Sequence, residues 1–399
     1  MPSLYVHVPF CVKKCDYCAF YSLPLLNSCE GLADYLRGVA QEIELRSNEA
    51  PAGVSSLYLG GGTPTVLSWR QLDDLLKEIH LHFTFLSGQG KEGQSFPEKT
   101  TEANPGTITE EKLKVLRDYG VNRISLGAQS FNDRLLYQIG RIHRAQDILH
   151  AVKRIRKAGI ENLNLDLIFG LPGQTLEDWQ DTLRKAVGLS PEHLSVYALT
   201  LEEDTPLGKK YLARDLNSFK MSDRDEAGDL PDDDLQADMY EWAVDFLSNK
   251  GFRRYEISNF ARSGYECQHN LAYWRCEEYI GLGPGAVSCM RRVRSKNIED
   301  MEAYLKDAAA GKRPFDGAET EFLTPEQQMS EYMMLGLRTE QGIDPIDFYH
   351  KFQVSIQDIY GQIMANYIDR DVLSISGGRL KIHPNYSFVA NSIIKDFIR

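Results

Sequence analysis

The chain has 399 residues, of which 42% are hydrophobic and 26% charged, so it can bury a sizeable core, and a disordered or collagen-like class is excluded. Its 45 basic and 57 acidic side chains leave a formal net charge of −12, which argues against nonspecific binding of nucleic acid. No apolar run approaches the roughly 18–20 residues that span a bilayer, and the N-terminus lacks the features of a secretory signal. We therefore expect a cytoplasmic protein.

Short β-rich runs alternate with amphipathic helical patterns over the first 200 residues. Strands are predicted at residues 4–8, 55–59, 100–103, 122–126, 162–168 and 193–199, and helices at residues 33–46, 68–82, 109–119, 145–158 and 176–187. Ser68 followed by Gln71 is typical of a capping box, and Gly120 and Gly159 stand where helix C-caps belong. Six strand–helix units are fewer than the eight of a closed barrel, so we predict an α/β fold with an open (β/α)6 partial TIM barrel at residues 1–203.

The alternation ends near residue 204. A helix is predicted at residues 232–249, and we interpret the acidic stretch 223–234 and the stretch 87–97 as surface loops. Residues 204–320 are assigned to an extension of the barrel. Residues 321–399 are predicted as a mostly helical, winged-helix-like module with a hairpin around Gly377 and Gly378. Because the chain is acidic and has no basic stripe, we expect no nucleic-acid partner and a structural role for this module.

Three of the seven cysteines, Cys11, Cys15 and Cys18, follow the first predicted strand within a short segment. A disulfide framework is not expected in a cytoplasmic chain of this size, so a metal site is the leading interpretation. Three thiolates can bind three corners of a 4Fe-4S cluster and leave the fourth iron for a small molecule. A structural zinc site needs four ligands. Zinc and an unligated set of thiols stay as alternatives.

The segment from Tyr5 to Cys18, with the aromatic Tyr17 before the last cysteine, resembles the signature of the radical S-adenosylmethionine (SAM) superfamily. The resemblance implies a 4Fe-4S cluster whose open iron chelates the amino and carboxylate groups of SAM. In active members, electron transfer cleaves SAM to methionine and a 5′-deoxyadenosyl radical. The cofactor carries that chemistry, while the protein binds it and excludes water.

Further candidate residues follow the later strands. The run from Gly60 to Pro64, which includes Gly61, Gly62 and Thr63, is by itself typical of a simple turn; after the cysteine motif it resembles the loop of the superfamily that contacts the SAM amino group. Polar side chains also lie at or near the ends of the next three strands: Glu102, Gln129, Arg141 and Asp166. We expect them to converge at the mouth of the barrel, where a carboxylate can hold ribose hydroxyls and an arginine can pair with the SAM carboxylate. Each of them singly could equally be a salt bridge or a cap.

Together these residues resemble the HemN/HemW family, the relatives of oxygen-independent coproporphyrinogen III oxidase, in which Tyr5 corresponds to a tyrosine near SAM and substrate. The dehydrogenases of this family carry a fourth cysteine two residues after the third, whereas Ala19 and Phe20 follow Cys18 here. A cysteine motif that ends with Cys18 followed by Ala19 and Phe20 is similar to that of the heme chaperone branch of the family. The run from His269 to Trp274 resembles the HNxxYW motif of that branch, whose histidine is implicated in holding heme. A hydrogen-bonded structural histidine is the alternative.

The resemblance implies a protein that binds a 4Fe-4S cluster, SAM and heme, and passes the heme to apo-hemoproteins such as respiratory-chain enzymes. It implies no coproporphyrinogen dehydrogenase activity. That dehydrogenase, which converts two propionates to vinyl groups, is the rival function, and a related radical-SAM methyltransferase or heme-degrading enzyme is a third. A homodimer and a transient association with a membrane are left open.

Overall fold

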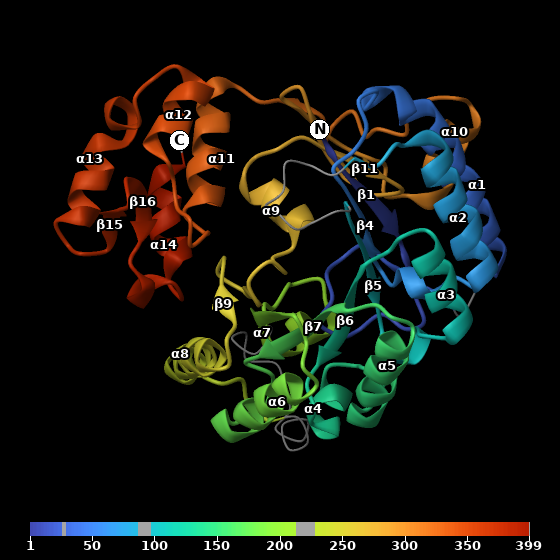
Figure 1. Ribbon diagram of the computed structural model, residues 1–399, viewed down its shortest axis with the longest axis horizontal. Helices are drawn as coiled ribbons and strands as arrows, with labels where there is room; N and C mark the ends of the chain where they lie inside the picture. Colours follow the sequence, from blue (N-terminus) through green and yellow to red (C-terminus); the bar gives the residue numbers. More distant parts are fainter. Residues whose placement is uncertain (26–28, 87–96, 213–227, 399) are drawn as a thin grey trace.

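The computed structural model describes residues 1–25, 29–86, 97–212 and 228–398. Within these residues, six parallel strands in the order β1, β4, β5, β6, β7 and β8 form the centre of a curved sheet (Figure 1). Their bounds are Ser3–Val8, Ser56–Gly61, Glu98–Ala103, Arg123–Gln129, Asn162–Phe169 and His193–Ala198. Each differs from its predicted range by no more than three residues at either end. The predicted open (β/α)6 barrel is confirmed.

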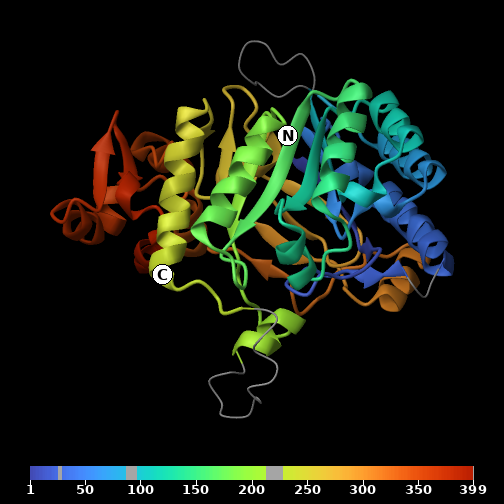
Figure 2. The same ribbon diagram turned by 90° about the horizontal axis from the view of Figure 1, so that it is seen from below.

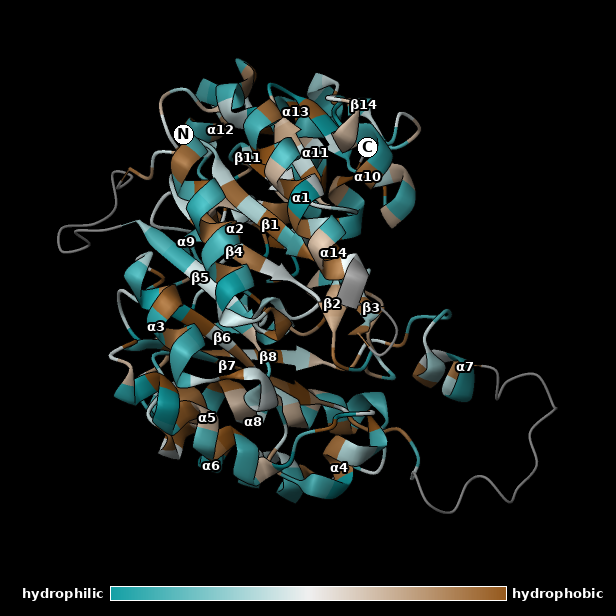
Figure 3. Ribbon diagram, turned by 90° about the vertical axis from the view of Figure 1, so that its right-hand side faces the viewer, coloured by the Kyte–Doolittle hydropathy of each residue, from teal (hydrophilic) through white to brown (hydrophobic). Residues whose placement is uncertain are grey.

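Five helices cover the outer face of these strands (Figure 3), and their outward sides are largely hydrophilic. They are α1 (Cys29–Arg46), α2 (Trp69–His82), α3 (Glu110–Asp118), α5 (Ala145–Lys157) and α6 (Leu176–Gly188), with the short α4 (Asp133–Gln138) after β6. The buried leucine, isoleucine and valine residues of the helices and strands form the core between the two layers. A layer of helices on a parallel sheet is the arrangement that strand–helix alternation predicts.

The predicted helix caps are present. The Ser68 hydroxyl accepts a hydrogen bond from the amide of Gln71, and the Gln71 side chain accepts one from the amide of Ser68 at 2.8 Å. Gly120 and Gly159 follow α3 and α5 with φ of +77° and +79°, a backbone conformation that glycine adopts without strain. Local sequence therefore determines where these helices begin and end.

The segment after the barrel contributes strands to both edges of the same sheet, which the sequence analysis did not predict. On one edge β11 (Tyr279–Leu282) pairs parallel with β1, and β12 (Val287–Met290), β13 (Val293–Lys296) and β14 (Glu321–Phe322) continue antiparallel. On the other edge β10 (Asn259–Ala261) and β9 (Arg253–Arg254) pair antiparallel beyond β8. These runs of two to four residues are too short for periodicity to reveal.

The described residues of the same segment form four helices. They are α7 (Pro206–Leu212), α8 (Asp233–Asn249), α9 (Gln268–Trp274) and α10 (Met301–Ala309). The helix predicted at residues 232–249 is α8, and Asp232 is its N-cap. Of the predicted loop 87–97, all but Pro97 lies outside the described residues, as do residues 223–227 of the predicted loop 223–234. Residues 228–232 are described and have no helix or strand, but Asp233 and Asp234 belong to the first turn of α8, so the loop prediction was wrong for these two residues.

The C-terminal module has a core of its own and lies beside α8 at one edge of the barrel (Figure 2). It consists of α11 (Pro325–Gly336), α12 (Pro345–Phe352), α13 (Ile356–Ile368), the strands β15 (Leu373–Ser376) and β16 (Arg379–Ile382), and α14 (Ala390–Ile394). The predicted hairpin is present, and both of its turn glycines, Gly377 and Gly378, have positive φ. None of the helices described here is long and apolar enough to cross a membrane.

Candidate cofactor site at the mouth of the barrel

The three clustered cysteines lie in the loop after β1, at the carboxyl end of the parallel strands. This loop is held by a parallel pair of two-residue strands, β2 (Phe10–Cys11) and β3 (Leu23–Pro24). All three thiols are free of disulfides and partly exposed. Burial raises the pKa of the Cys11 and Cys18 thiols. Two sulfurs have polar neighbours: Cys11 Sγ lies 3.5 Å from Thr63 Oγ1, and Cys15 Sγ accepts a hydrogen bond from Arg141 Nη1 at 3.4 Å.

Among the described residues, no three potential ligands already converge on the position of a single metal ion. A 4Fe-4S cluster does not require such convergence, because each thiolate binds a different iron. Thiolate is also the donor type that such clusters prefer. The donor set therefore fits an iron–sulfur cluster.

The glycine-rich run after β4 joins this cysteine loop to the sheet. The amides of Gly62 and Thr63 donate to the carbonyls of Val8 and Phe10 at 2.9 and 2.7 Å. A Cβ at Gly62 would lie 2.5 Å from the Phe10 carbonyl oxygen, so no other residue fits without moving the backbone. The run thus has a structural function that the sequence analysis did not predict, namely to hold the cysteine loop against β4.

Arg141, Asn104 and Gln129 surround the carbonyl end of β6. Arg141 Nη2 donates to the Gly127 carbonyl at 2.5 Å and to Asn104 Oδ1. Gln129 follows a β-bulge and has a φ of +64°, a strained conformation for a residue other than glycine. Gln129 Oε1 and Arg141 Nε are both buried, and neither has a hydrogen-bond partner among the described residues. Buried polar atoms without partners are uncommon, and here they lie beside the cysteine loop, where a polar ligand would satisfy them.

Two carboxylates lie inside the barrel, one on β5 and one on β7. Glu102 accepts hydrogen bonds from the Tyr58 hydroxyl at 3.0 Å and the Gly61 amide at 3.1 Å. Burial, followed by repulsion from Asp166, raises the pKa of Glu102 to about 8. Asp166 accepts from the Ser125 hydroxyl at 3.0 Å and the Asn164 amide group at 2.7 Å, and burial raises its pKa too. The two carboxylates are therefore held in place, and their protonation responds to a ligand or charge placed between them.

Tyr5 lies on β1 beside this carboxylate pair. Its hydroxyl is 3.0 Å from His7 Nδ1, and His7 Nε2 donates to the Tyr21 carbonyl at 2.9 Å. His7 is therefore the neutral tautomer with its proton on Nε2, and the Tyr5 hydroxyl donates to Nδ1. His7 is a buried histidine of the core near the cysteine loop.

His269, by contrast, lies toward the opposite end of the barrel from the cysteines. It belongs to α9, and its ring is buried beneath Tyr58, with centroids 5.1 Å apart. Nδ1 lies 2.8 Å from the Ser56 hydroxyl and Nε2 lies 3.0 Å from the Tyr273 hydroxyl. Burial lowers the pKa of His269 to about 3. Both ring nitrogens are thus engaged, and neither is free to bind iron in this conformation.

The structure also places residues in the barrel that the sequence analysis did not select. Asn104 bridges Thr63 and Arg141, and it lies two residues after Glu102. Ser56 and Tyr58 are two residues apart on β4, so both side chains point to the inside of the barrel. This spacing is visible in the sequence and could have identified them. Glu98 accepts from the amides of Gln268 and His269 at 3.1 Å and so caps α9. Nothing local to Glu98 indicates this role, since its partners lie about 170 residues away.

Comparisons with known proteins agree with this architecture. Residues 5–186 match the model of the radical SAM superfamily, and residues 323–385 match the HemN C-terminal domain. Over 396 residues the chain is 36% identical to the heme chaperone HemW of Lactococcus lactis, covering 99% of this chain and 97% of that one. It is 33% identical to the heme chaperone HemW of Bacillus subtilis, covering 100% and 99%.

This chain belongs to the HemW family of radical SAM proteins.

The structural comparison supports the same fold. The coproporphyrinogen III oxidase HemN of Escherichia coli, a radical SAM enzyme, superposes with a TM-score of 0.82 over 100% of this chain and 90% of that one, at 23% identity. At this identity the likeness establishes the fold and not the activity. The HemW relatives and the HemN structure together place the cysteine loop and the helical C-terminal module in one family architecture.

Proposed function

We propose that this protein is a heme chaperone: it binds a 4Fe-4S cluster, SAM and heme, and delivers the heme to apo-hemoproteins such as respiratory-chain enzymes. The observation that carries the proposal is similarity over the full chain to relatives named heme chaperone HemW. The absence of a fourth cysteine after Cys18, where Ala19 and Phe20 stand, agrees with it.

Cys11, Cys15 and Cys18 are the proposed ligands of the cluster. The Arg141 guanidinium donates a hydrogen bond to the Cys15 sulfur at 3.4 Å, and a cation in this position can also stabilise the charge of a bound cluster. Thr63 lies beside the Cys11 sulfur, and hydrogen bonding around cluster sulfurs adjusts a cluster's reduction potential. When bound, the cluster and SAM together supply one-electron chemistry at the SAM sulfonium.

The cradle that we propose for SAM consists of the residues that meet at the mouth of the barrel. Gln129 Oε1 and Arg141 Nε supply the unpartnered polar atoms there, and the Glu102 carboxylate can accept from ribose hydroxyls. The other members of the cradle are Tyr5, Gly61, Gly62, Thr63 and Asp166. Glu102 and Asp166 are only partly exposed to solvent, so the cradle also limits the access of water to whatever it holds.

His269 is the residue that family resemblance proposes for holding heme. Its imidazole reaches a heme iron only if Nε2 leaves the Tyr273 hydroxyl, because both nitrogens are engaged in this structure. We therefore propose two steps for this residue: release from Tyr273, then coordination. Loss of the heme spectrum in His269→Ala, with the fold intact, would support that role.

The deciding experiment uses protein with its cluster reconstituted anaerobically. We expect it to take up heme and to transfer it to an apo-cytochrome b, measured as the absorbance of the holo-cytochrome after the two proteins are separated. The same preparation, given coproporphyrinogen III, SAM and reductant, should form no protoporphyrinogen. Turnover of coproporphyrinogen III without heme transfer would replace the chaperone proposal by the dehydrogenase.

A further inference from the structure

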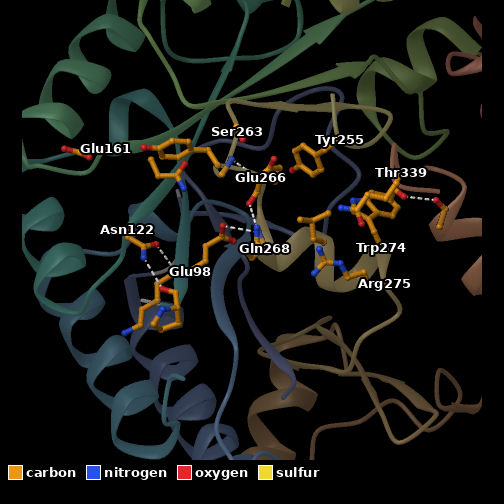
Figure 4. Close-up of a pocket in the computed structure, with 18 of the residues that line it drawn as sticks. Glu98, Asn122, Glu161, Tyr255, Ser263, Glu266, Gln268, Trp274, Arg275 and Thr339 are labelled. Carbon is orange, nitrogen blue, oxygen red and sulfur yellow. Dashed lines mark hydrogen bonds between the residues drawn. The ribbon is translucent and has the colours of Figure 1, made fainter. Parts of the chain in front are cut away.

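A large cavity lies at the amino end of the barrel strands, whereas the cysteine loop lies at their carboxyl end. Its volume is about 1390 Å³. Its walls are the starts of β5, β6 and β7, helix α9, and the facing side of the C-terminal module. In Figure 4, Trp274, Arg275 and Thr339 lie at one end of the cavity, and Asn122 and Glu161 at the other. Ligand pockets are commonly about 300–1,000 Å³, so this one has room for a large ligand.

Aromatic side chains form much of the wall at the α9 end. Trp274 and Tyr332 line the cavity there, with Tyr255 and Tyr265 further along. The indole nitrogen of Trp274 is buried, and no described residue accepts its hydrogen bond. Tryptophan usually finds a partner for this group when it is buried. A flat wall with an unsatisfied donor is a suitable surface for a planar ligand that carries acceptors.

Cations without strong carboxylate partners lie at the same end. Among the described residues, Arg275 forms one ion pair, a long one with Glu277 at 3.9 Å. Lys351 Nζ donates to the Cys276 carbonyl at 3.2 Å and lies 5.3 Å from the centre of the Tyr332 ring. Among the described residues, Lys351 has no ion pair within 4.0 Å.

Five cations among the described residues line the cavity, and two of them, Lys99 and Arg117, belong to the end near Asn122, where they donate to the carbonyls of Tyr119 and Ala158. Most of the other charges of the wall are engaged. Glu98 caps α9, Glu266 accepts from the Gly264 amide, and Arg379 is paired with Asp344 at 2.9 Å. Asp347 remains at this end as one negative charge. At the α9 end, Arg275 and Lys351 are therefore the cations best able to meet a dianion.

We propose that this cavity is the heme site, with the porphyrin plane against Trp274 and Tyr332 and the two propionates toward Arg275 and Lys351. The inference rests on the proposed function and adds to it the place and the contacts of the heme. With the porphyrin in this cavity, His269 could bind the iron only if its ring, once released from Tyr273, also turned out of the barrel interior toward the cavity. In the HNxxYW motif, Trp274 faces this cavity, while His269 faces the barrel interior and fixes α9 to β4. Heme and SAM thus occupy opposite ends of the barrel and bind at the same time.

The test is a hemin titration of full-length protein with its cluster reconstituted, followed by absorbance. We expect Arg275→Glu/Lys351→Glu to bind hemin about tenfold more weakly than the parent, since two partly exposed charge pairs are changed from attractive to repulsive. Lys153→Glu/Lys185→Glu, which makes the same charge change on the outer faces of α5 and α6, should bind hemin as the parent does. Hemin dimethyl ester, which lacks the propionate charges, should bind the parent and the Arg275/Lys351 variant equally.

Tryptophan fluorescence gives a second readout that does not depend on the charge variants folding. Bound heme should quench Trp274, so Trp274→Phe should remove a distinct share of the quenching seen in the parent. Hemin affinity and quenching that are unchanged in these variants would overturn the cavity assignment while leaving the chaperone function standing. A parent protein that binds no hemin at all would overturn the proposed function itself.

Discussion

Replacing His269 with alanine separates a structural role from a role in binding iron. The imidazole joins Ser56 on β4 to Tyr273 on α9, and it packs under Tyr58. Its removal leaves two hydroxyl groups without their partner and a void between helix and sheet. We expect the variant to be less stable than the parent even when no heme is present.

The magnitude follows from those two hydroxyls. A buried polar group left without its partner costs about 1–3 kcal/mol, so the two hydroxyls predict a loss of about 2–6 kcal/mol, to which the void adds. The pH dependence should change too. Because the pKa of His269 is lowered to about 3 in the folded protein against an ordinary 6.5, its contribution is complete above pH 6.5 and is lost as the pH falls toward 3. Between pH 7.5 and pH 5 this loss is about 2 kcal/mol, and the variant should lack it.

The assay is urea unfolding of the heme-free protein at pH 7.5 and pH 5. His150→Ala, an exposed histidine on α5, is the matched control and should change stability by less than about 0.5 kcal/mol. If His269→Ala unfolds at the same urea concentration as the parent at both pH values, the structural interpretation of His269 is refuted. Loss of the heme spectrum with stability unchanged would instead assign His269 to the iron.

Three further predictions concern the barrel. Serine in place of any one of Cys11, Cys15 or Cys18 should abolish the brown chromophore and the bound iron and sulfide, measured by absorbance and iron analysis. Burial raises the pKa of Glu102 to about 8 from an ordinary 4.5, so the free energy of unfolding should fall as the pH rises from 4.5 to 8. In cofactor-free protein, Glu102→Gln should remove about 3 kcal/mol of this fall between pH 5 and pH 8. Ser68→Ala should lower the free energy of unfolding by about 1 kcal/mol through loss of the α2 cap, measured by urea unfolding.

Each of these has a clear contrary result. Iron retained at the parent level in a cysteine variant would reject that residue as a ligand. An unfolding free energy for Glu102→Gln with the same slope against pH as the parent would mean that the carboxylate is ionised in the folded protein at pH 7. A stability unchanged in Ser68→Ala would show that α2 is fixed by its packing on the sheet and not by its cap.

Much of the mouth of the barrel could be predicted from the sequence, because the signals there are local. Cys11, Cys15 and Cys18 lie within one loop, and Glu102 and Gln129 end successive strands whose carboxyl ends share one edge of the sheet. The parallel register of neighbouring strands is then enough to bring Glu102 and Gln129 to the same edge. The helix caps are local in the same way, since Ser68 and Gln71 are three residues apart.

The opposite end of the barrel was decided by tertiary contacts. The orientation of His269 depends on Ser56, 213 residues away, and on Glu98, which caps α9 from 171 residues away. From the sequence alone, His269 could be either a heme ligand or a hydrogen-bonded structural histidine. Nothing near it in the chain indicates which face of α9 packs against the barrel. The cavity likewise joins the starts of three barrel strands to α9 and to a module that begins more than 150 residues after the last of these strands. Residue types and spacing could therefore specify the chemistry of each local motif, whereas only packing between distant segments determined which side chains of the HNxxYW helix face the barrel and which face the cavity.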